Sequence, residues 1–396
     1  MAENKQNKRP NVPPLRFPEF TEPWERYKLS EFATKITKKN RDNSISNVLS
    51  NSATLGIVQQ SQYFEREIVT DENLVGYYVI NEDDFVYNPR KSVTAPYGPV
   101  NRYYCKESGI ISPLYLCFKV NGINKSFLLW FFKSPKWYRY IHLNGDSGVR
   151  HDRVSIKDDL FLDMPINVPS RAEQEKVSNL FELIDRRIAA QSKLIEDLKQ
   201  LKSALVERLY CQHNPNFKIG DLVVQVSKRN RGDNDYSVLS VNNRLGFIEQ
   251  SEQFEDRSVA SEDTSNYKVV SRDDFAYNPA RINVGSIARL TSFKNGIVSP
   301  MYICFHTKKQ LLPQYLEYFF DTRYFYYEMQ KRLEGSVRLC LSWEGLCNIP
   351  IAVLPIEQQE KVGKRISRLD DKISLEVSHL NLLKTQKQYL LQAMFI

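Results

Sequence analysis

The sequence predicts an α+β fold in which two pseudo-symmetric α/β domains are separated by two long antiparallel helices that form a coiled-coil spacer. Two observations lead to this prediction. The first half of the chain recurs in the second half, and each copy ends in a long stretch with apolar residues at helical spacing. The repeat predicts two domains of one kind, and the apolar stretches predict the helices that join them.

Composition sets the limits of this fold. With 396 residues and a mass of 46.3 kDa, the chain is long enough for two or three domains. Its 42% hydrophobic and 26% charged residues are typical of a globular protein. The longest apolar run, 127–132, is far shorter than the roughly 20 residues of a membrane span. We therefore expect a cytoplasmic protein with no membrane partner.

Cysteine, histidine and net charge narrow the chemistry. The six cysteines lack a CxxC pair and the five histidines are dispersed, so we expect reduced thiols and no metal site. The net charge of +8 permits a polyanionic partner but does not identify one.

Four segments match in the same order in both halves, at shifts that fall from 190 to 185 residues. Ordered matches over so long a span indicate an internal duplication. The matches are YKLSEFATKITKKNRD at 27–42 with FKIGDLVVQVSKRNRG at 217–232, DDFVYNP at 83–89 with DDFAYNP at 273–279, GIISPLYLCF at 109–118 with GIVSPMYICF at 296–305, and QEKV at 174–177 with QEKV at 359–362.

The duplication divides the chain into five segments. Each domain opens with β-branched runs broken by Asn, Gly and Pro, which predict strands, and continues into aromatic-rich helical stretches. The Pro-rich and Lys-rich N-terminal arm is expected to be anchored by Phe17, Phe20 and Trp24. The predicted segments are the arm at 1–24, a first domain at 25–170, a first spacer helix at 171–212, a second domain at 213–355 and a second spacer helix at 356–396.

Each spacer helix is predicted from apolar residues at steps of three and four, a pattern typical of a helix that packs along a partner. A helix over 173–210 is about 57 Å long. Because the first helix leaves one domain and enters the other, a second helix packed on it must run in the opposite direction. The predicted coiled-coil core residues are Ile184, Ile188, Ile195, Leu198, Leu205, Leu369, Ile373, Leu380, Leu383 and Leu390.

Polar residues that interrupt the two apolar stripes predict the helix register. An antiparallel pairing centred between residues 195 and 198 places Lys202 near Glu376 and Gln191 near Lys387. A parallel pairing would instead place Lys202 against Lys387, so we expect the antiparallel arrangement. The alternative is that these polar side chains simply face solvent.

Two domains joined by long helices are suited to contact two separate half-sites on one DNA duplex. Half-sites on one face of DNA lie roughly 34 Å apart, a distance that the spacer helices can bridge. Two similar but non-identical domains would then read a bipartite, asymmetric target with an unread gap. We expect Lys and Arg to contact phosphates, and side chains that reach base edges to supply specificity.

The first candidates for DNA contact lie at the two Tyr-Asn-Pro turns. There a turn with a fixed proline places an amide beside a basic group, and in the major groove Asn pairs with adenine and Arg with guanine. The alternative is a turn whose Asn bonds its own backbone. These candidates are Asn88, Arg90, Lys91, Asn278 and Arg281.

Further candidates lie after these turns. Between the turn and the Gly-Ile-x-Ser-Pro run the two copies differ most, as readers of two half-sites must, although drift in a surface loop would look the same. Later, GDSGVRHDR at 145–153 aligns with GSVR at 335–338, where Gly allows close approach to a phosphate and Ser and Arg donate to it. A plain loop is the alternative there. The candidates are Arg102, Asn283 and Arg289 in the divergent segments, and Ser147, Arg150, Arg153, Ser336 and Arg338 in the loops.

The basic runs at 38–41 and 228–231 are expected to face phosphates or solvent and not to read sequence.

Together, LRFPEF before Trp24, the Tyr-Asn-Pro turns, the Gly-Ile-x-Ser-Pro runs, the GSxR-like loops and the Gln-containing helix starts resemble the specificity (S) subunits of type I restriction-modification systems. The resemblance covers essentially the whole chain. It implies two target-recognition domains that bind double-stranded DNA, and long helices of the type conserved in that family. It also implies two modification (methyltransferase) subunits that bind S-adenosylmethionine and methylate adenine, restriction subunits that translocate DNA, and no cofactor on this chain.

An enzyme is the main competing class. An adenine methyltransferase would show an Asn/Asp-Pro-Pro-aromatic site and a Gly-rich cofactor loop, whereas YNPR and YNPA lack the second proline and the aromatic residue. The sequence also lacks a P-loop and a carboxylate cluster for metal-dependent cleavage. We therefore expect a non-catalytic subunit. The remaining alternatives are a recognition subunit of another multi-subunit DNA-modifying or defence system, and a coiled-coil scaffold that binds only protein.

Overall fold

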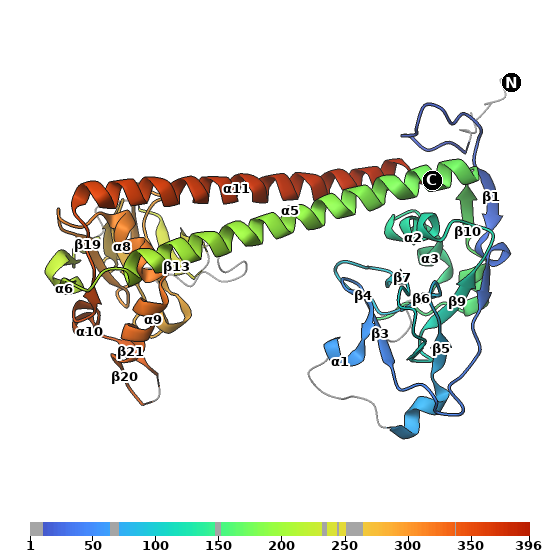
Figure 1. Ribbon diagram of the computed structural model, residues 1–396, viewed down its shortest axis with the longest axis horizontal. Coiled ribbons are helices and arrows are strands. Elements are labelled where there is room, and N and C mark those ends of the chain that lie inside the picture. Colours follow the sequence, from blue (N-terminus) through green and yellow to red (C-terminus); the bar gives the residue numbers. More distant parts are fainter. Residues whose placement is uncertain are drawn as a thin grey trace. The chain divides into compact units, whose positions relative to one another are not determined.

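The computed structural model describes residues 11–63, 71–146, 152–231, 236–243, 245–250, 264–336 and 338–396 (Figure 1). The chain forms two compact units: unit 1 takes in the chain up to Gln191 together with His379–Ile396, and unit 2 is Ser192–Ser378. Each unit holds one sheet-rich domain with the beginning of one long helix and the end of the other. The α+β fold class predicted from the sequence is confirmed.

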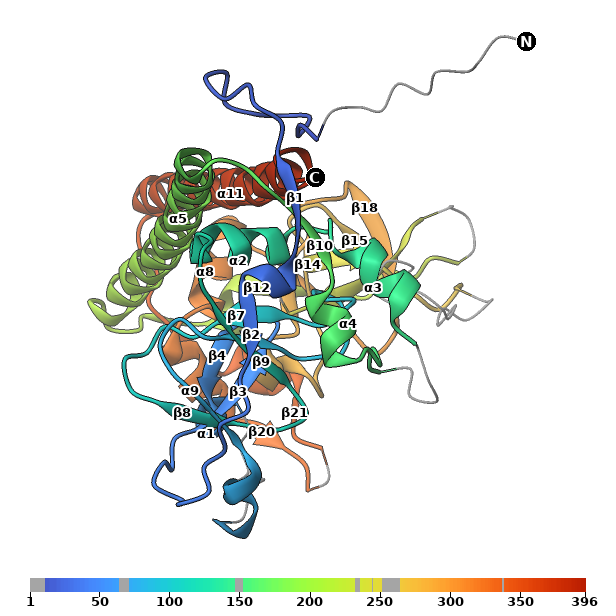
Figure 2. The same cartoon turned by 90° about the vertical axis from the view of Figure 1, so that its right-hand side faces the viewer.

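The described residues of unit 1 form ten strands. They are β1 (Glu25–Lys28), β2 (Ala33–Lys35), β3 (Val48–Ser52), β4 (Gly56–Gln59), β5 (Tyr78–Ile80), β6 (Phe85–Tyr87), β7 (Val100–Arg102), β8 (Gly109–Ile111), β9 (Leu116–Val120) and β10 (Pro165–Val168). One sheet has the order β2-β9-β6-β7, and a second has the order β4-β3-β8-β5. Strand β1 pairs with β10, and the two lie side by side in Figure 2. Strands β6 and β8 are buried along their whole length because each lies between two neighbours.

The domain of unit 2 has the same strand order. Its strands are β11 (Phe217–Lys218), β12 (Val223–Val226), β13 (Val238–Asn242), β14 (Gly246–Glu249), β15 (Lys268–Ser271), β16 (Phe275–Tyr277), β17 (Ile287–Arg289), β18 (Asn295–Val298), β19 (Ile303–Thr307), β20 (Leu333–Glu334), β21 (Cys340–Leu341) and β22 (Pro350–Ile351). The sheets run β12-β19-β16-β17 and β14-β13-β18-β15, and β11 pairs with β22. In each domain one internal pair, β3 with β8 and β13 with β18, is parallel. In unit 2, β20 and β21 also form a hairpin.

Short helices cover the sheets, and two long ones follow the domains. In α2 the apolar run Phe127–Phe132 is wholly buried, and the helix is capped by Asn124, whose Oδ1 accepts from Phe127 N at 3.0 Å. None of the described helices is both long and apolar enough to cross a bilayer. The helices are η1 (Leu29–Glu31), α1 (Gln60–Tyr63), η2 (Asp71–Gly76), α2 (Lys125–Lys133), α3 (Tyr138–Asn144), α4 (Asp158–Leu162), α5 (Arg171–Cys211), α6 (Ile219–Leu222), η3 (Ile282–Val284), α8 (Pro313–Phe320), α9 (Arg323–Gln330), α10 (Trp343–Cys347) and α11 (Ile356–Ala393).

Each domain core takes in the start of one long helix and the end of the other. In unit 1, Val177 and Phe181 of α5 join the same apolar cluster as Leu391 and Phe395. Unit 2 repeats this arrangement with the residues found at a shift of 185, namely Val362, Ile366, Val206 and Tyr210. The beginning of each helix therefore lies beside the end of the other, and α5 and α11 run antiparallel as predicted.

The ion pairs between the long helices differ from the predicted partners. Lys387 pairs with Asp185 in unit 1, and Lys202 Nζ lies 2.6 Å from Asp370 Oδ1 in unit 2. Each aspartate lies six residues before the predicted partner, Gln191 or Glu376, so the predicted register was wrong. The apolar stripe is compatible with several antiparallel registers, and the packing of the helix ends into the domain cores selects one of them.

One predicted core residue is contradicted. Leu205 is 43% exposed, whereas its neighbour Val206 is buried, because the end of α5 packs against the domain of unit 2. Ile195 and Leu383 are buried. The remaining predicted core residues, Ile184, Ile188, Leu198, Leu369, Ile373, Leu380 and Leu390, are half-buried.

The N-terminal arm is tied to the start of α5. Glu173, which is 1% exposed, receives two hydrogen bonds of 2.7 Å from the Arg16 guanidinium and one of 3.2 Å from Trp24 Nε1. Trp24 is buried in the core of unit 1, and Phe17 packs against that core, while Phe20 is half-buried. A buried carboxylate thus anchors the arm together with the aromatic residues.

The repeated Gln of the QEKV segments joins each long helix to its domain. Gln174 Oε1 accepts from Asn124 N, and Gln359 Oε1 accepts from Leu312 N, both at 2.8 Å. Asn124 and Leu312 are the N-cap residues of α2 and α8. Both glutamines also donate to backbone carbonyls of the segment that precedes the long helix. This repeated motif is therefore a structural joint.

Candidate nucleic-acid interface

A cleft of about 840 Å³ in unit 2 brings together three predicted DNA-contacting residues, Asn278, Arg281 and Arg338. Its walls combine amide, hydroxyl and guanidinium groups with apolar side chains, a mixture suited to base edges and the thymine methyl group. The other lining residues are Leu239, Ser240, Val241, Gln250, Tyr267, Pro279, Ala280, Ser286, Ser299, Met301, Tyr302 and Cys340.

The Tyr-Asn-Pro turn that forms one wall follows directly from buried strand β16. Asn278 Oδ1 accepts from Ala280 N at 3.0 Å, and Arg281 N donates to Asn278 O at 3.0 Å. This turn leads into η3, which ends at Gly285 with φ of +89°. The exposed Arg281 thereby lies at the mouth of the cleft, while Asn283 is half-buried within η3.

The hairpin β20–β21 supplies another wall. Leu341 N donates to Pro279 O at 3.0 Å, so the hairpin is joined to the Tyr-Asn-Pro turn by a backbone hydrogen bond. Gly335 has φ of +113°, and a Cβ at this position would lie 2.4 Å from Arg338 O, so the bend requires glycine. Ser336 and Arg338 are both exposed beyond this bend.

The two Tyr-Asn-Pro asparagines differ between the domains. Asn88 Nδ2 donates to Asn51 O at 3.0 Å and its Oδ1 accepts from Arg90 N at 3.0 Å, so both ends of this amide bond backbone. Asn88 therefore fits the alternative in which the asparagine side chain forms hydrogen bonds with the backbone. Asn278 caps its own turn in the same way, but among the described residues its Nδ2 contacts only Met301 Sδ, at 3.7 Å. The Asn278 amide thus keeps donor capacity toward the cleft.

The remaining candidates of unit 1 lie around the first turn. Arg90 is exposed and its backbone forms a bridge with Arg153, while Lys91 is half-buried. Arg153 Nε is buried, makes no hydrogen bond to the part of the chain that the structure describes, and lies 3.7 Å from Asp152 Oδ2. Ser147 and Arg150 lie outside the described residues.

Arg102 and Arg289, two further candidates, are both held in ion pairs within their domains. Arg102 Nε donates to Asp83 Oδ1 at 2.8 Å. Arg289 Nη1 lies 2.9 Å from Asp273 Oδ1, and its Nη2 lies 2.8 Å from Glu317 Oε2. In the absence of DNA these guanidinium groups therefore support the fold.

The aspartates in these pairs explain why the Asp-Asp-Phe run is repeated. Asp83 and Asp273 have φ of +76° and +71°, in the left-handed region that Asp tolerates better than most residues. The following carboxylates, Asp84 and Asp274, accept from Asn81 N and Ser271 N at 2.7 and 2.8 Å. Burial raises the pKa of Asp84 and of Asp274. The run therefore builds a tight turn between two strands.

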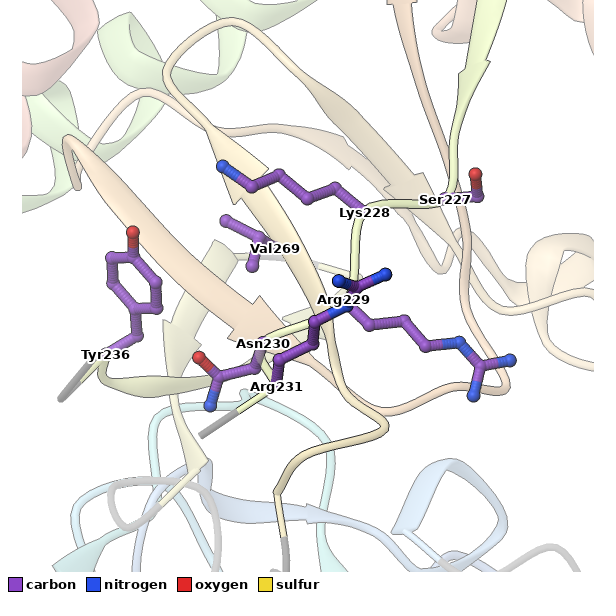
Figure 3. A pocket seen from close by; sticks show the side chains of 7 residues that line it. All are labelled: Ser227, Lys228, Arg229, Asn230, Arg231, Tyr236 and Val269. Atoms are coloured by element: carbon purple, nitrogen blue, oxygen red, sulfur yellow. The ribbon is translucent and has the colours of Figure 1, made fainter. Parts of the chain in front are cut away.

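A second, basic pocket of about 690 Å³ follows β12 in unit 2 (Figure 3). Arg229 Nη1 donates to Asn266 Oδ1 at 2.6 Å, whereas Lys228 and Arg231 extend from the same loop as exposed cations. Exposed cations on a concave surface suit a phosphate group. The pocket is lined by Ser227, Lys228, Arg229, Asn230, Arg231, Tyr236 and Val269.

Sequence reasoning missed several polar residues of the cleft, above all Gln250. This residue follows β14 and approaches the Tyr-Asn-Pro turn only through the sheet. The one available signal was that Gln60 and Gln250 occupy equivalent positions in the two copies. Ser240 and Ser299 come from two further strands or their ends, so their convergence is a property of the tertiary structure.

We compared the sequence and the structure with those of known proteins. No protein-family model matches the sequence, and no curated protein matches it. Among solved structures, a chain from a study of complex assembly and conformational transition of the type I R-M system matches with a TM-score of 0.59 and 12% identity, covering 94% of this chain and 97% of that chain. The HsdS subunit of Thermoanaerobacter tengcongensis matches with a TM-score of 0.52 and 13% identity, covering 96% of this chain and 98% of that chain. The type I restriction-modification S subunit of M. genitalium also matches with a TM-score of 0.52 and 13% identity, covering 97% of this chain and 99% of that chain. The chain therefore has the fold of the S subunits of type I restriction-modification systems.

Proposed function

We propose that this chain is a sequence-specific DNA-binding subunit that recognises a bipartite, asymmetric target. In this proposal it directs methylation and restriction by the partner subunits of a type I restriction-modification complex. The observation that carries the proposal is the cleft of unit 2, where Asn278, Arg281 and Arg338 converge in one of two domains with the same strand order.

The chemistry of the cleft supports base recognition. An amide pairs with adenine and a guanidinium with guanine in the major groove, and each such bidentate pair discriminates between bases by about 1–3 kcal/mol. The basic pocket with Lys228 and Arg231 would hold phosphates and so position the domain on the duplex. Exposed Arg90 is the corresponding candidate in the first domain.

The long helices are proposed to keep the two readers at a constant spacing. Support comes from the joints at Gln174 and Gln359, which tie each helix start to its domain, and from the ion pairs between α5 and α11. A constant spacing would give the target a gap of constant length.

Catalysis is assigned to partner subunits and not to this chain. Two modification subunits would carry S-adenosylmethionine and methylate adenine, and restriction subunits would translocate and cleave DNA, all in the cytoplasm. A purified chain that methylates DNA without partners would contradict this assignment.

The test is to express the chain with its modification subunits and to map methylated positions across a genome. The expected result is a split motif with a constant gap. Replacing residues 25–170 with the matching domain of another such protein should change one half of the motif and leave the other half and the gap unchanged.

Two outcomes would contradict the proposal. Methylation without a split motif would exclude bipartite recognition by this chain. A complex with no salt-sensitive affinity for DNA would instead support a scaffold that binds only protein.

A further inference from the structure

Gln250 has a buried oxygen that makes no hydrogen bond with any residue that the structure describes. It follows β14 and lines the cleft of unit 2 together with Asn278. Its Oε1 atom is buried and makes no hydrogen bond in the described part of the chain. A buried acceptor without a partner costs free energy, and that free energy is recovered when a ligand brings a donor. A donor that enters the cleft and reaches this oxygen would recover that free energy.

The surroundings of Gln250 indicate what kind of donor fits. Asn278 lines the same cleft, and its donor Nδ2 contacts the sulfur of Met301 and no other group within the described ranges. Ser240 and Ser299 add hydroxyl groups. Arg281 and Arg338 are exposed, in contrast to the buried oxygen of Gln250. A neutral amide next to hydroxyl groups suits an uncharged base edge, whereas the exposed arginines suit guanine or phosphate.

We propose that Gln250 is a specificity-determining residue that reads an adenine in the half-site of the second domain. Its Oε1 would accept from the adenine N6 amino group while its Nε2 donates to N7. This inference rests on the proposed function and deepens it, because it names one base and the side chain that selects it.

The first domain is not expected to read DNA in this way. The residue equivalent to Gln250 in the first domain is Gln60. Asn51, which takes the place of Val241, uses its amide to bond the carbonyls of Val86 and Pro99. A change at Gln250 should therefore affect one half of the target only.

The test uses the complex of the full chain with its modification subunits. Two substitutions are compared by competition binding to duplexes that vary one base pair at a time, and by methylation mapping. Gln250→Met keeps the length of the side chain but removes both polar groups. We expect it to reduce discrimination at one base pair by about 5- to 150-fold and to leave the other half-site unchanged.

The second substitution, Gln250→Glu, keeps an acceptor but loses the donor to N7. Since carboxylates accept from cytosine N4, the preferred base at that same position should move from adenine toward cytosine. A shift of preference confined to one position cannot arise from loss of folding.

Thermal unfolding separates recognition from a structural role. Because Gln250→Met removes an unsatisfied buried oxygen, its melting temperature should be unchanged or higher than that of the wild type. Gln225→Met, an exposed position on β12 in the same domain, is the matched control and should leave both motif and stability unchanged.

The outcomes distinguish this inference from the proposed function. If the wild type yields a split motif and both Gln250 variants yield the same motif with the same discrimination, Gln250 does not read a base. Loss of all DNA affinity in a normally folded Gln250→Met variant would also overturn a role at a single base pair. If the wild type itself yields no split motif, the proposed function fails first.

Discussion

Arg102 and Arg289 occupy the same place in the two domains, and each holds an aspartate whose backbone is left-handed. In unit 1 this aspartate, Asp83, also receives a hydrogen bond of 2.8 Å from Lys125 Nζ. Partial burial pushes the pKa of Asp83 up, but the hydrogen bonds and charges of Lys125 and Arg102 outweigh it and hold the pKa below its ordinary value. The ionised carboxylate of Asp83 therefore stabilises the folded state.

This arrangement predicts a pH dependence of stability. Because the folded pKa of Asp83 is lowered, its stabilising contribution should be complete above the unfolded value of about 4 and be lost as the pH falls through the folded pKa. Asp83→Asn preserves the left-handed backbone, since Asn tolerates positive φ. At pH 7 it should destabilise the protein by about 1 kcal/mol.

Thermal unfolding between pH 7 and pH 3 checks this prediction. The melting temperatures of wild type and Asp83→Asn should converge at the acidic end. Asp371→Asn, an exposed position on α11, is the control and should follow the wild type throughout. If the difference in melting temperature between wild type and Asp83→Asn is the same at every pH, the ionisation of Asp83 does not contribute to stability.

Among the elements, α11 depends on one glutamine for its attachment. Gln359 is fully buried, and its amide satisfies the N-cap N–H of α8 and the carbonyls of Gln310 and Leu354. Hydrogen bonds to buried backbone groups are costly to lose because those groups find no water. The start of α11 is thus fixed to the domain more firmly than apolar packing alone would allow.

Gln359→Met should therefore lower the free energy of unfolding by at least about 2 kcal/mol, because similar volume is kept while three backbone groups lose their partner. Gln358→Met, at the exposed neighbouring position, should change stability by less than about 0.5 kcal/mol. Urea denaturation of the two variants gives the comparison. Equal stabilities would mean that the amide does not hold the helix to its domain.

For the whole molecule, charge predicts how binding responds to salt. The chain carries a net charge of +8, and exposed Lys228 lines the basic pocket. Each phosphate contact contributes about 0.9 to the slope of log affinity against log salt concentration. DNA affinity of the complex should therefore fall steeply as salt rises.

Lys228→Gln should reduce that slope by about one and weaken binding to all sequences equally, because a phosphate contact carries no base information. Binding titrations from low to moderate salt test it. Lys364→Gln, exposed on α11, is the control and should keep the wild-type slope. A Lys228 variant with an altered motif and an unchanged slope would show that Lys228 contacts a base and not a phosphate.

The local sequence pattern was sufficient to predict where the long helices begin. Helices α5 and α11 begin at Arg171 and Ile356, where the apolar periodicity and the repeat predicted them. The α+β class and the antiparallel direction of the helices also followed, because periodicity and connectivity are properties of neighbouring residues along the chain.

Side-chain roles depended on what tertiary packing brings together. A basic residue in a divergent segment has the same sequence signature whether it faces DNA or an aspartate, so the sequence did not predict the ion pairs of Arg102 and Arg289. The predicted register of α5 and α11 was wrong for a similar reason. Contacts between residues distant in sequence, such as Tyr210 and Tyr315, anchor the helix ends.

The sequence by itself determined two similar domains with long helices that run in opposite directions. Only the tertiary structure decided which polar groups are used inside the fold and which remain open, as the contrast between Asn88 and Asn278 shows. The physical reason is that a hydrogen bond depends on the distance and angle between two groups, and for groups far apart in the chain these are set by packing.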